Sequence, residues 1–172
     1  ANLHKNWIGT DIAQLLYNQT GQPVTVINDA DAAGLAEMRF GIEDAHLYKT
    51  VFFLTVGTGI GSAIFVDGHL LPNTELGHLE VRGEEAEHRA SDAVRRQKNL
   101  SWKRWGKRFT EVLKTYESLI NPDLFIIGGG ISSKFENYAE YLKIQTKILP
   151  AELENLAGII GAAMAAKEAE LP

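Results

Sequence analysis

The chain has 172 residues, of which 45% are hydrophobic and 23% are charged, as in an ordinary soluble globular domain. It contains no cysteine, which excludes disulfides and thiolate metal sites. The formal net charge is −5. No apolar run approaches a membrane span and the first residues lack the apolar core of a signal peptide, so we expect a cytoplasmic protein with no membrane partner.

Strand-like and helix-like segments alternate along the chain, which predicts an α/β layered fold. In chain order we expect a helix capped at Thr10 or Asp11 and ending near Tyr17, a buried strand over 24–27, a helix over 30–40, strands over 51–56 and 62–66, a loop over 69–83, a helix over 84–98, a long helix from a Ser101 cap to Asn121, a strand over 124–127, a helix over 133–141, a short strand over 144–149 and a helix over 155–167.

Asp29 is the first candidate for chemistry, because it follows the 24–27 segment and stands with Asn28 at the start of a helix. A carboxylate there faces the crevice in which α/β sheets bind ligands, and it can accept a proton from a substrate hydroxyl. The alternative, that Asp29 only caps the helix, is the commoner role of such a residue and stays open.

Two glycine-rich segments follow apolar strands and are candidates for phosphate binding. Residues 57–61 read Gly-Thr-Gly-Ile-Gly, and residues 128–130 are three glycines. Glycines let backbone N–H groups approach a phosphate, and a threonine adds a hydroxyl donor. The spacing is neither that of a dinucleotide fingerprint nor that of a Walker loop, and tight turns explain both segments equally well.

The 75–80 segment places Glu75, His78 and Glu80 within six residues. Two carboxylates and an imidazole offer acceptors and a switchable donor to several hydroxyl groups, although a solvated loop is the alternative. Glu75 and His78 also have Glu-x-x-His spacing, but Gly77 weakens a helix there and no second pair occurs, so we predict no metal site.

A basic block lies between Arg89 and Arg108, where eight basic residues accompany one acid, Asp92. One such block in an otherwise acidic protein indicates an anionic partner. Trp102 and Trp105 fall on the apolar stripe of the long helix, so they indicate a buried core position rather than nucleic-acid binding. A solvated helix face is the alternative. The candidate residues for binding such an anion are Lys103, Arg104, Lys107 and Arg108.

Four segments, in this order, resemble motifs of the ROK family of repressors, open reading frames and kinases. Residues 28–37 resemble its Asn-Asp-Ala-Asn-x-Ala segment, 54–62 its Gly-Thr-Gly-x-Gly turn, 75–78 its Glu-x-Gly-His motif and 126–131 its late glycine segment. Asp31 stands where the family usually has Asn, and the three zinc-binding cysteines of most members are missing. These departures, with segments 87–91, 101–105 and 150–158, resemble the polyphosphate glucokinase branch.

The resemblance implies a role for each matching residue. Asp29 would be the general base on the 6-hydroxyl of glucose. Asn28, Glu75 and His78 would bind other hydroxyls, with Glu87 as a further sugar ligand and Glu80 as its competitor. The phosphate-binding residues would be Gly57, Thr58, Gly59, Gly61, Gly128, Gly129 and Gly130.

The resemblance also implies an architecture and a reaction. Residues 1–172 would be the second lobe of an actin-like, ribonuclease H-like sugar kinase, without the phosphate-loop lobe, and inactive alone. The whole enzyme would transfer a phosphoryl group from polyphosphate or ATP, with Mg²⁺ and without zinc, to glucose. A homodimer is expected and nucleic acid is not. The alternatives are a sugar-responsive ROK regulator and a stand-alone sugar-binding or dimerisation module.

Overall fold

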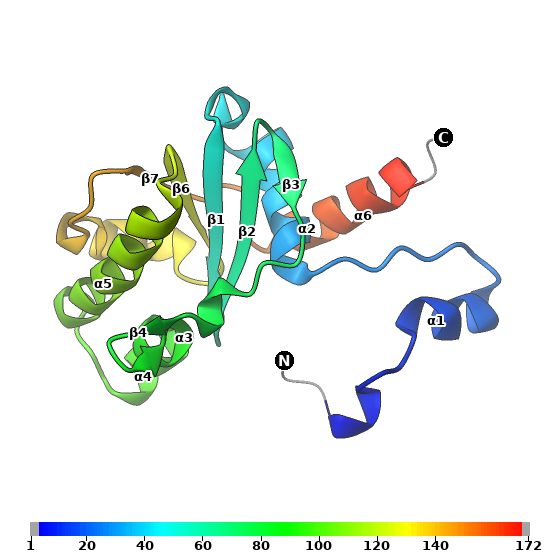
Figure 1. Cartoon of the computed structure of the whole chain (residues 1–172), viewed down its shortest axis with the longest axis horizontal. Coiled ribbons are helices and arrows are strands. Elements are labelled where there is room, and N and C mark those ends of the chain that lie inside the picture. The colour runs from blue at the N-terminus through cyan, green and yellow to red at the C-terminus, as the bar shows by residue number, and fades with distance from the viewer. Residues whose placement is uncertain (1–3, 170–172) are drawn as a thin grey trace.

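A five-stranded mixed sheet forms the centre of the computed structural model, which describes residues 4–169 (Figure 1). Its strand order is β3-β2-β1-β6-β7. A two-stranded hairpin, β4 (Glu80–Val81) with β5 (Glu84–Glu85), lies apart from it. The strands of the main sheet are β1 (Thr50–Val56), β2 (Ile60–Val66), β3 (His69–Leu71), β6 (Leu124–Gly128) and β7 (Lys147–Pro150).

Strand directions bring the two glycine-rich segments to the same edge of the sheet. β1 is antiparallel to β2, so the 57–61 segment forms the turn between them, at residues 57–59, and the start of β2, at residues 60 and 61. β1 is parallel to β6, and Thr55 pairs with Gly128 at their carboxyl ends. Glycines far apart in the sequence therefore meet where an α/β sheet presents its ligand crevice.

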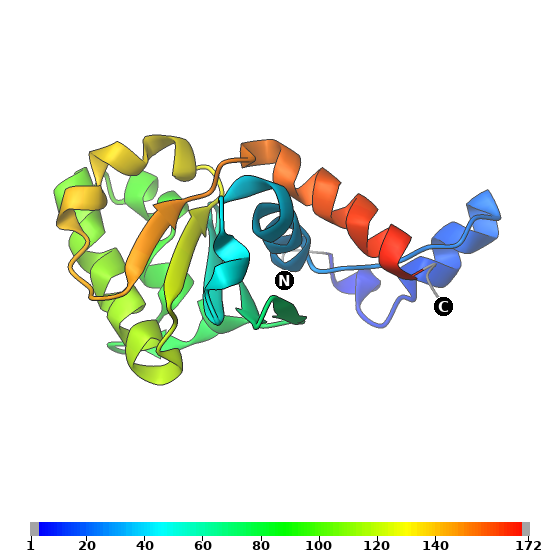
Figure 2. The ribbon, with the colours of Figure 1, turned by 90° about the horizontal axis from the view of Figure 1, so that it is seen from above.

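Helices cover both faces of the sheet (Figure 2). Successive side chains of β1 point to opposite faces, and both sets are apolar, so each face needs a covering layer. Phe52 and Leu54 pack against α5 (Trp102–Ile120) on one face. Val51 and Phe53 point to the other face, which α2 (Asp29–Ala36) covers. The result is the three-layer α/β architecture that the alternating segments predict.

The long helix α5 matches its prediction closely. The Ser101 side chain caps it by accepting the N–H of Arg104 at 3.3 Å, and Asn121 ends it in the left-handed conformation. Trp105 is fully buried, and its indole N–H donates to the Ala90 carbonyl at 2.9 Å. The apolar stripe is therefore core, as its spacing indicates.

The remaining helices are α1 (Ile12–Thr20), α3 (Ala86–Ala90), α4 (Asp92–Gln97) and α6 (Ala157–Ala169). Short 3₁₀ segments are Lys5–Trp7, Ala45–Leu47, Leu76–His78, Ser132–Asn137, Ala139–Tyr141 and Glu154–Leu156, and a π-helical segment, Glu37–Gly41, follows α2. Within residues 4–169, no helix combines the length and the hydrophobicity needed to cross a bilayer.

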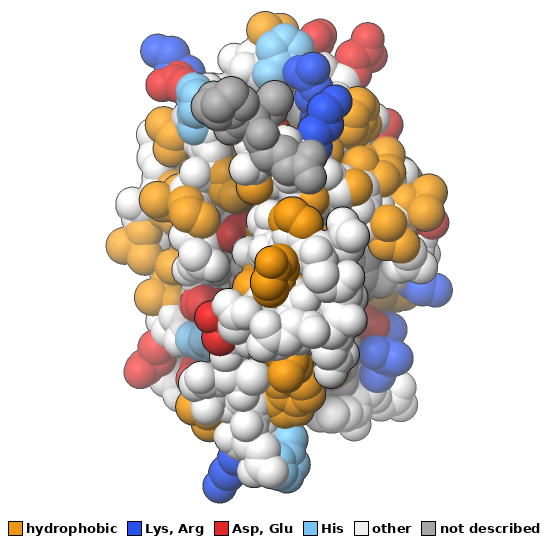
Figure 3. All heavy atoms as spheres, turned by 90° about the vertical axis from the view of Figure 1, so that its right-hand side faces the viewer, with side chains coloured by type: hydrophobic (Ala, Val, Ile, Leu, Met, Phe, Trp, Pro, Cys, Tyr) orange, Lys and Arg blue, Asp and Glu red, His pale blue; other side chains and the backbone are white. Residues whose placement is uncertain are grey.

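α1 and α6 extend to the same side of the sheet (Figure 2). Figure 3 views that side and shows hydrophobic side chains over much of its surface. Tyr17 of α1 and Ile159 of α6 are exposed, and α6 meets α2 where Gly161 touches the backbone of Ala32. A Cβ at position 161 would overlap that backbone, so glycine is what allows the two helices to approach.

Four predicted elements are wrong. The loop expected over 69–83 contains two short strands, because β3 pairs with β2 and β4 pairs with β5. Residues 24–27 form no strand, because none of the described strands pairs with them, and Val26 is 59% exposed. The helix expected over 84–98 is a strand and two helices, because Ser91 leaves the helical conformation and caps α4 through the N–H of Val94. The helix over 133–141 consists of 3₁₀ turns instead.

Candidate functional site

An open cleft of about 350 Å³ lies at the carboxyl end of β1 and the start of α2. Its volume suits a small polar ligand. Most of the predicted sugar and phosphate residues meet in it, although they come from separate parts of the chain. The cleft is lined by Asn28, Asp29, Thr55, Gly57, Thr58, Gly59, Ile60, Gly61, Ser62, Glu75, His78, Glu87 and Gly129.

Asn28, not Asp29, caps α2. The Asn28 side-chain oxygen accepts the N–H groups of Ala30 at 2.8 Å and Asp31 at 3.2 Å, which leaves its amide nitrogen to donate to Glu75 at 3.4 Å. Asp29 is the first residue of the helix and is exposed in the cleft. The interpretation of Asp29 as the helix cap is therefore wrong, and its carboxylate hydrogen-bonds no residue between 4 and 169.

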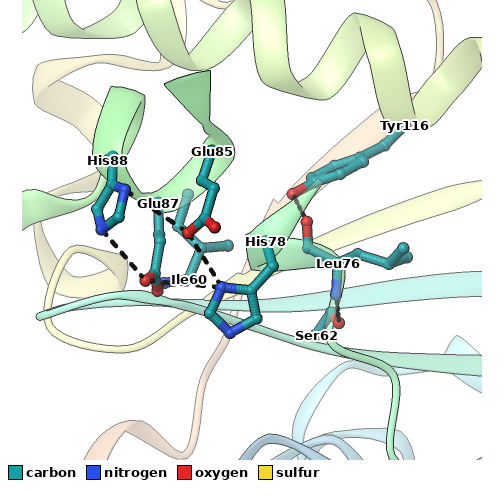
Figure 4. A network of polar contacts seen from close by, with 8 residues as sticks. All are labelled: Ile60, Ser62, Leu76, His78, Glu85, Glu87, His88 and Tyr116. Carbon is teal, nitrogen blue, oxygen red and sulfur yellow. Dashed lines mark hydrogen bonds and ion pairs between the residues drawn. The ribbon is translucent and has the colours of Figure 1, made fainter. Parts of the chain in front are cut away.

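Buried polar groups hold the turn that carries Glu75 and His78. Asp31 accepts the N–H of Asn73 at 2.8 Å. Ser62 accepts the N–H of Leu76 at 3.1 Å, and the Tyr116 hydroxyl donates to the carbonyl of Leu76 at 2.7 Å (Figure 4). Sequence reasoning missed Ser62 and Tyr116 as supports, because these contacts span 14 and 40 residues.

Asp31 is a buried carboxylate beside the cleft. It is 1% exposed, and its Oδ1 atom has no partner among the described residues. Burial raises the pKa of Asp31, the Asn73 N–H opposes this, and the charges of Glu75 and Asp29 raise it further. Asp31 stands where the ROK motif usually has Asn, and this departure is the signal in the sequence that singles out Asp31.

His78 lies in a network of two carboxylates and a second imidazole (Figure 4). Its Nδ1 is 3.1 Å from Glu85 Oε2 and 3.9 Å from Glu87 Oε1. His88 lies 3.6 Å from Glu85 and 3.7 Å from Glu87. The hydrogen bond to Glu85 is the main cause that raises the pKa of His78, and Glu87 and Glu75 add to it. Sequence reasoning missed Glu85 and His88.

The same network is the one place among residues 4–169 where His and acidic ligand atoms gather as a metal site would need. Atoms of His78, Glu85 and Glu87 all lie within 4.8 Å of one another. Glu75, the partner of His78 in the Glu-x-x-His spacing, is outside this group. His78 pairs with both Glu85 and Glu87, so these side chains have partners without a metal. The absence of zinc stays a prediction.

The 57–61 turn presents backbone donors to the cleft. Gly57 donates to the Gly59 carbonyl at 3.0 Å, and Ile60 donates to Glu87 at 3.4 Å. The N–H groups of Thr58 and Gly59 donate to no residue between 4 and 169. Two adjacent unpaired donors beside a hydroxyl form an arrangement suited to anion binding.

The late glycines differ in their surroundings. Gly129 lines the cleft at φ +77°, and a Cβ there would lie 2.7 Å from the Val56 backbone. Gly128 is buried, and a Cβ would come within 2.8 Å of the Phe53 ring. Gly130 has open space around it and does not line the cleft. Of the three, the structure brings Gly129 to the candidate phosphate site.

Glu87 and Glu80, the two competing sugar ligands, lie in different places. Glu87 is in α3 and lines the cleft. Glu80 is in the β4–β5 hairpin and lines a separate hollow with Arg82 and Glu111. The geometry favours Glu87.

The basic block separates into paired and unpaired residues. Arg89 pairs with Glu111, and Arg95 and Arg96 both pair with Asp92. The four remaining candidates form no ion pair with any residue that the structure describes. Lys103, Arg104 and Lys107 are exposed and Arg108 is half-buried. α4 links this region to the turn, because Ala93 donates to the Gly57 carbonyl at 3.1 Å.

With this geometry in place, comparisons with known proteins identify the family. The model of the ROK family matches residues 1–90, which is more than half of the chain. The chain belongs to the ROK family. A polyphosphate glucokinase of Mycobacterium tuberculosis (strain CDC 1551 / Oshkosh) is 50% identical over 96% of this chain, and one of Mycobacterium leprae is 48% identical over 96%. This ROK chain spans 62% and 51% of those two proteins.

Solved structures give the fold. The polyphosphate/ATP-glucomannokinase of Arthrobacter sp. strain KM superposes with a TM-score of 0.91 at 49% identity, over 98% of this chain and 66% of that one. A ROK glucokinase of Streptomyces griseus superposes with a TM-score of 0.76 at 22% identity, over 91% of this chain and 72% of that one. The predicted actin-like fold is confirmed.

Proposed function

We propose that this chain is the sugar-binding lobe of a glucokinase, which transfers a phosphoryl group from polyphosphate or ATP to the 6-hydroxyl of glucose. The observation that supports this most is the cleft itself. Asp29, whose carboxylate bonds to none of the described residues, shares it with hydroxyl-binding side chains and with the 57–61 turn. The mycobacterial and Arthrobacter relatives carry names that describe this reaction class.

In this proposal each residue acts through a contact that it can make in the cleft. Asp29 accepts the proton of the attacking hydroxyl, which is the task of a positioned base. Asn28, Glu75, His78 and Glu87 bind the other sugar hydroxyls, for which they supply both acceptors and donors. Thr58 and Gly59 donate to the phosphate of the donor, since their N–H groups are not used elsewhere in residues 4–169.

Mg²⁺ would be held chiefly by the phosphate oxygens of the donor, because Mg²⁺ prefers phosphate and carboxylate oxygens and keeps several waters, which leaves the Asp29 carboxylate free to act as the base. The ion would supply charge neutralisation for the transferred group. Zinc is not part of the proposal, since the chain has no cysteine and His78 is already engaged by Glu85.

Four cations of α5 that form no ion pair within the described part of the chain favour polyphosphate as a donor. Polyphosphate is a flexible polyanion, which a row of cations without base-reading groups can hold. We propose that Lys103, Arg104, Lys107 and Arg108 form a track leading through α4 toward the 57–61 turn. A homodimer is part of this proposal, and nucleic acid is not.

A chain of this length should not catalyse the reaction by itself. It spans 62% of the M. tuberculosis relative, and phosphoryl transfer requires donor, metal and acceptor to be positioned together. We propose that residues 1–172 form the second lobe and that a phosphate-loop lobe completes the site.

The experiment measures glucose binding by calorimetry and glucose 6-phosphate formation on the same sample of this chain. Binding without turnover supports the lobe interpretation. Turnover by the chain alone would show that one lobe suffices. Absence of glucose binding, in a sample shown to be folded by circular dichroism, would contradict the sugar-binding role.

A further inference from the structure

Among residues 4–169, partners of the His78 imidazole lie on one side of the ring only. Its Nδ1 is 3.1 Å from Glu85 Oε2, the shortest contact that the ring makes with a charged group in the described chain. Nε2 lies on the opposite side of the ring from Glu85 (Figure 4). His78 lines the cleft and its side chain is 44% exposed, so one ring nitrogen is held and the other is available to a ligand.

Glu85 is placed to act through His78 and not on the ligand directly. It does not line the cleft. It belongs to the β4–β5 hairpin, where it lies opposite Glu80 in the strand register. The next residue, Ala86, donates its backbone N–H to the Leu79 carbonyl at 2.9 Å. The hairpin therefore holds Glu85 beside the turn that ends at His78.

The other charged groups around His78 do not duplicate this contact. Glu75 lies on the same turn and Glu87 approaches from α3, at 3.9 Å from Nδ1. Glu87 is also engaged by the Ile60 N–H at 3.4 Å, and His88 faces both Glu85 and Glu87. Glu85 is the carboxylate within hydrogen-bond distance of the His78 ring.

The hydrogen bond that one ring nitrogen makes decides which nitrogen carries the proton in neutral histidine. A carboxylate accepts only, so Nδ1 must donate to Glu85 and Nε2 is left as the acceptor. We propose that Glu85 is a positioning residue for the sugar site, which fixes the ring of His78 in the Nδ1–H tautomer with Nε2 turned to a sugar hydroxyl. This rests on the proposed function, because it assigns a task to Glu85 within the sugar site.

The test compares Glu85→Ala and Glu85→Gln with a control, Glu84→Gln, in the 172-residue chain. Glu84 precedes Glu85 in the same hairpin but pairs with Arg89 at 3.6 Å, away from His78. Two readouts are used. ¹⁵N-histidine spectra over pH report the tautomer and titration midpoint of His78, and calorimetry reports glucose affinity.

We expect Glu85→Ala to lose the Nδ1–H tautomer, to lower the titration midpoint of His78, and to weaken glucose binding about threefold to tenfold, the range for one hydrogen bond. Glu85→Gln keeps a neutral acceptor, so it should lower the midpoint while retaining the tautomer and most of the affinity. The control should match the wild-type chain in both readouts.

An unchanged tautomer and midpoint in both Glu85 variants would overturn the assignment. If Glu85→Ala does not fold, the lowered midpoint and retained tautomer of Glu85→Gln decide it. If the wild-type chain binds no glucose, the proposed function fails, and the spectra alone decide whether Glu85 orients His78. The two failures are therefore distinguishable.

Discussion

The carboxylate of Glu37 accepts the backbone N–H of Leu153 at 2.8 Å, across 116 residues of sequence. Its second oxygen accepts the N–H of Glu152 at 3.1 Å, and the residue is fully buried. Glu37 follows α2, and residues 152 and 153 lie just before α6. One side chain therefore ties the two helices on this face of the sheet together.

Replacing Glu37 with Gln should destabilise the fold although it removes a buried charge. Burial raises the pKa of Glu37, and the two N–H donors oppose that shift. Glutamine offers one acceptor and one donor, so its amide group would face an N–H and leave both unsatisfied. We expect a loss of about 1–3 kcal/mol in urea unfolding. The exposed control Glu43→Gln should change stability by less than about 0.5 kcal/mol. Equal effects of the two substitutions would contradict the tether.

Asp31→Asn should stabilise the fold near neutral pH, in contrast to Glu37→Gln. The raised pKa of Asp31 means that the folded chain holds this proton more tightly than the unfolded chain. Its contribution to the free energy of unfolding is therefore fully present below the ordinary pKa of 3.8 and is lost as pH rises through the pKa of the folded state. Asparagine keeps an acceptor for the Asn73 N–H without the charge. The melting temperature of Asp31→Asn relative to wild type should therefore rise from pH 4 to pH 7. A difference that is constant with pH would contradict this.

Asp29→Asn tests the proposed base. In a full-length enzyme the substitution should nearly abolish turnover while glucose still binds, because only the carboxylate can take the proton and the amide keeps the shape. Asp29 is exposed at the first helical position, so folding should be unaffected. Steady-state kinetics measures the turnover, and calorimetry measures the glucose binding. An unchanged kcat would remove Asp29 from this role.

The polyphosphate track is tested by reversing two of its charges, in Lys103→Glu with Lys107→Glu. We expect a higher KM for long polyphosphate, a weaker dependence on salt and little change with ATP, since a short donor does not need the distant cations. Lys49→Glu with Lys134→Glu reverses two exposed charges outside the block and is the matched control. Equal effects on both donors, or none, would leave the block as a solvated surface.

Elemental analysis should find no tightly held zinc. Among residues 4–169 a site would have to draw on His78, Glu85 and Glu87. His78 already pairs with both carboxylates, and these oxygen and imidazole groups lack the thiolates of a structural site. Mass spectrometry of the metal content after dialysis checks this. About one zinc per chain, lost together with folding on chelation, would show that the network is a metal site.

The parts of the fold that sequence reasoning predicted are those that local chemistry decides. Ser101 and Asn121 mark the ends of α5 because capping depends on residues within one turn. The apolar run of β1 predicts a strand buried on both faces, which is what the sheet requires of it. Asn28 and Glu75 were selected from motifs, and the structure places them 3.4 Å apart through their side chains.

The parts that were missed depend on partners distant in the sequence. Residues 24–27 have strand composition, but a strand needs a neighbour and the described sheet offers none at that place. Glu85 looked like part of a helix, although it belongs to a hairpin whose contact with His78 is made across a turn. Neither outcome follows from local propensity.

α1 buries none of its residues, and a connector without secondary structure at 23–28 separates it from α2. A nine-residue helix without a buried face depends on its own caps, here Asp11 and Gly21, and helices of fewer than about 12 residues are marginal in water. Hydrogen exchange at the amides of α1 should therefore report local fraying, and protection in β1 and β6 should report global unfolding. The chain would then melt in two steps of very different cooperativity.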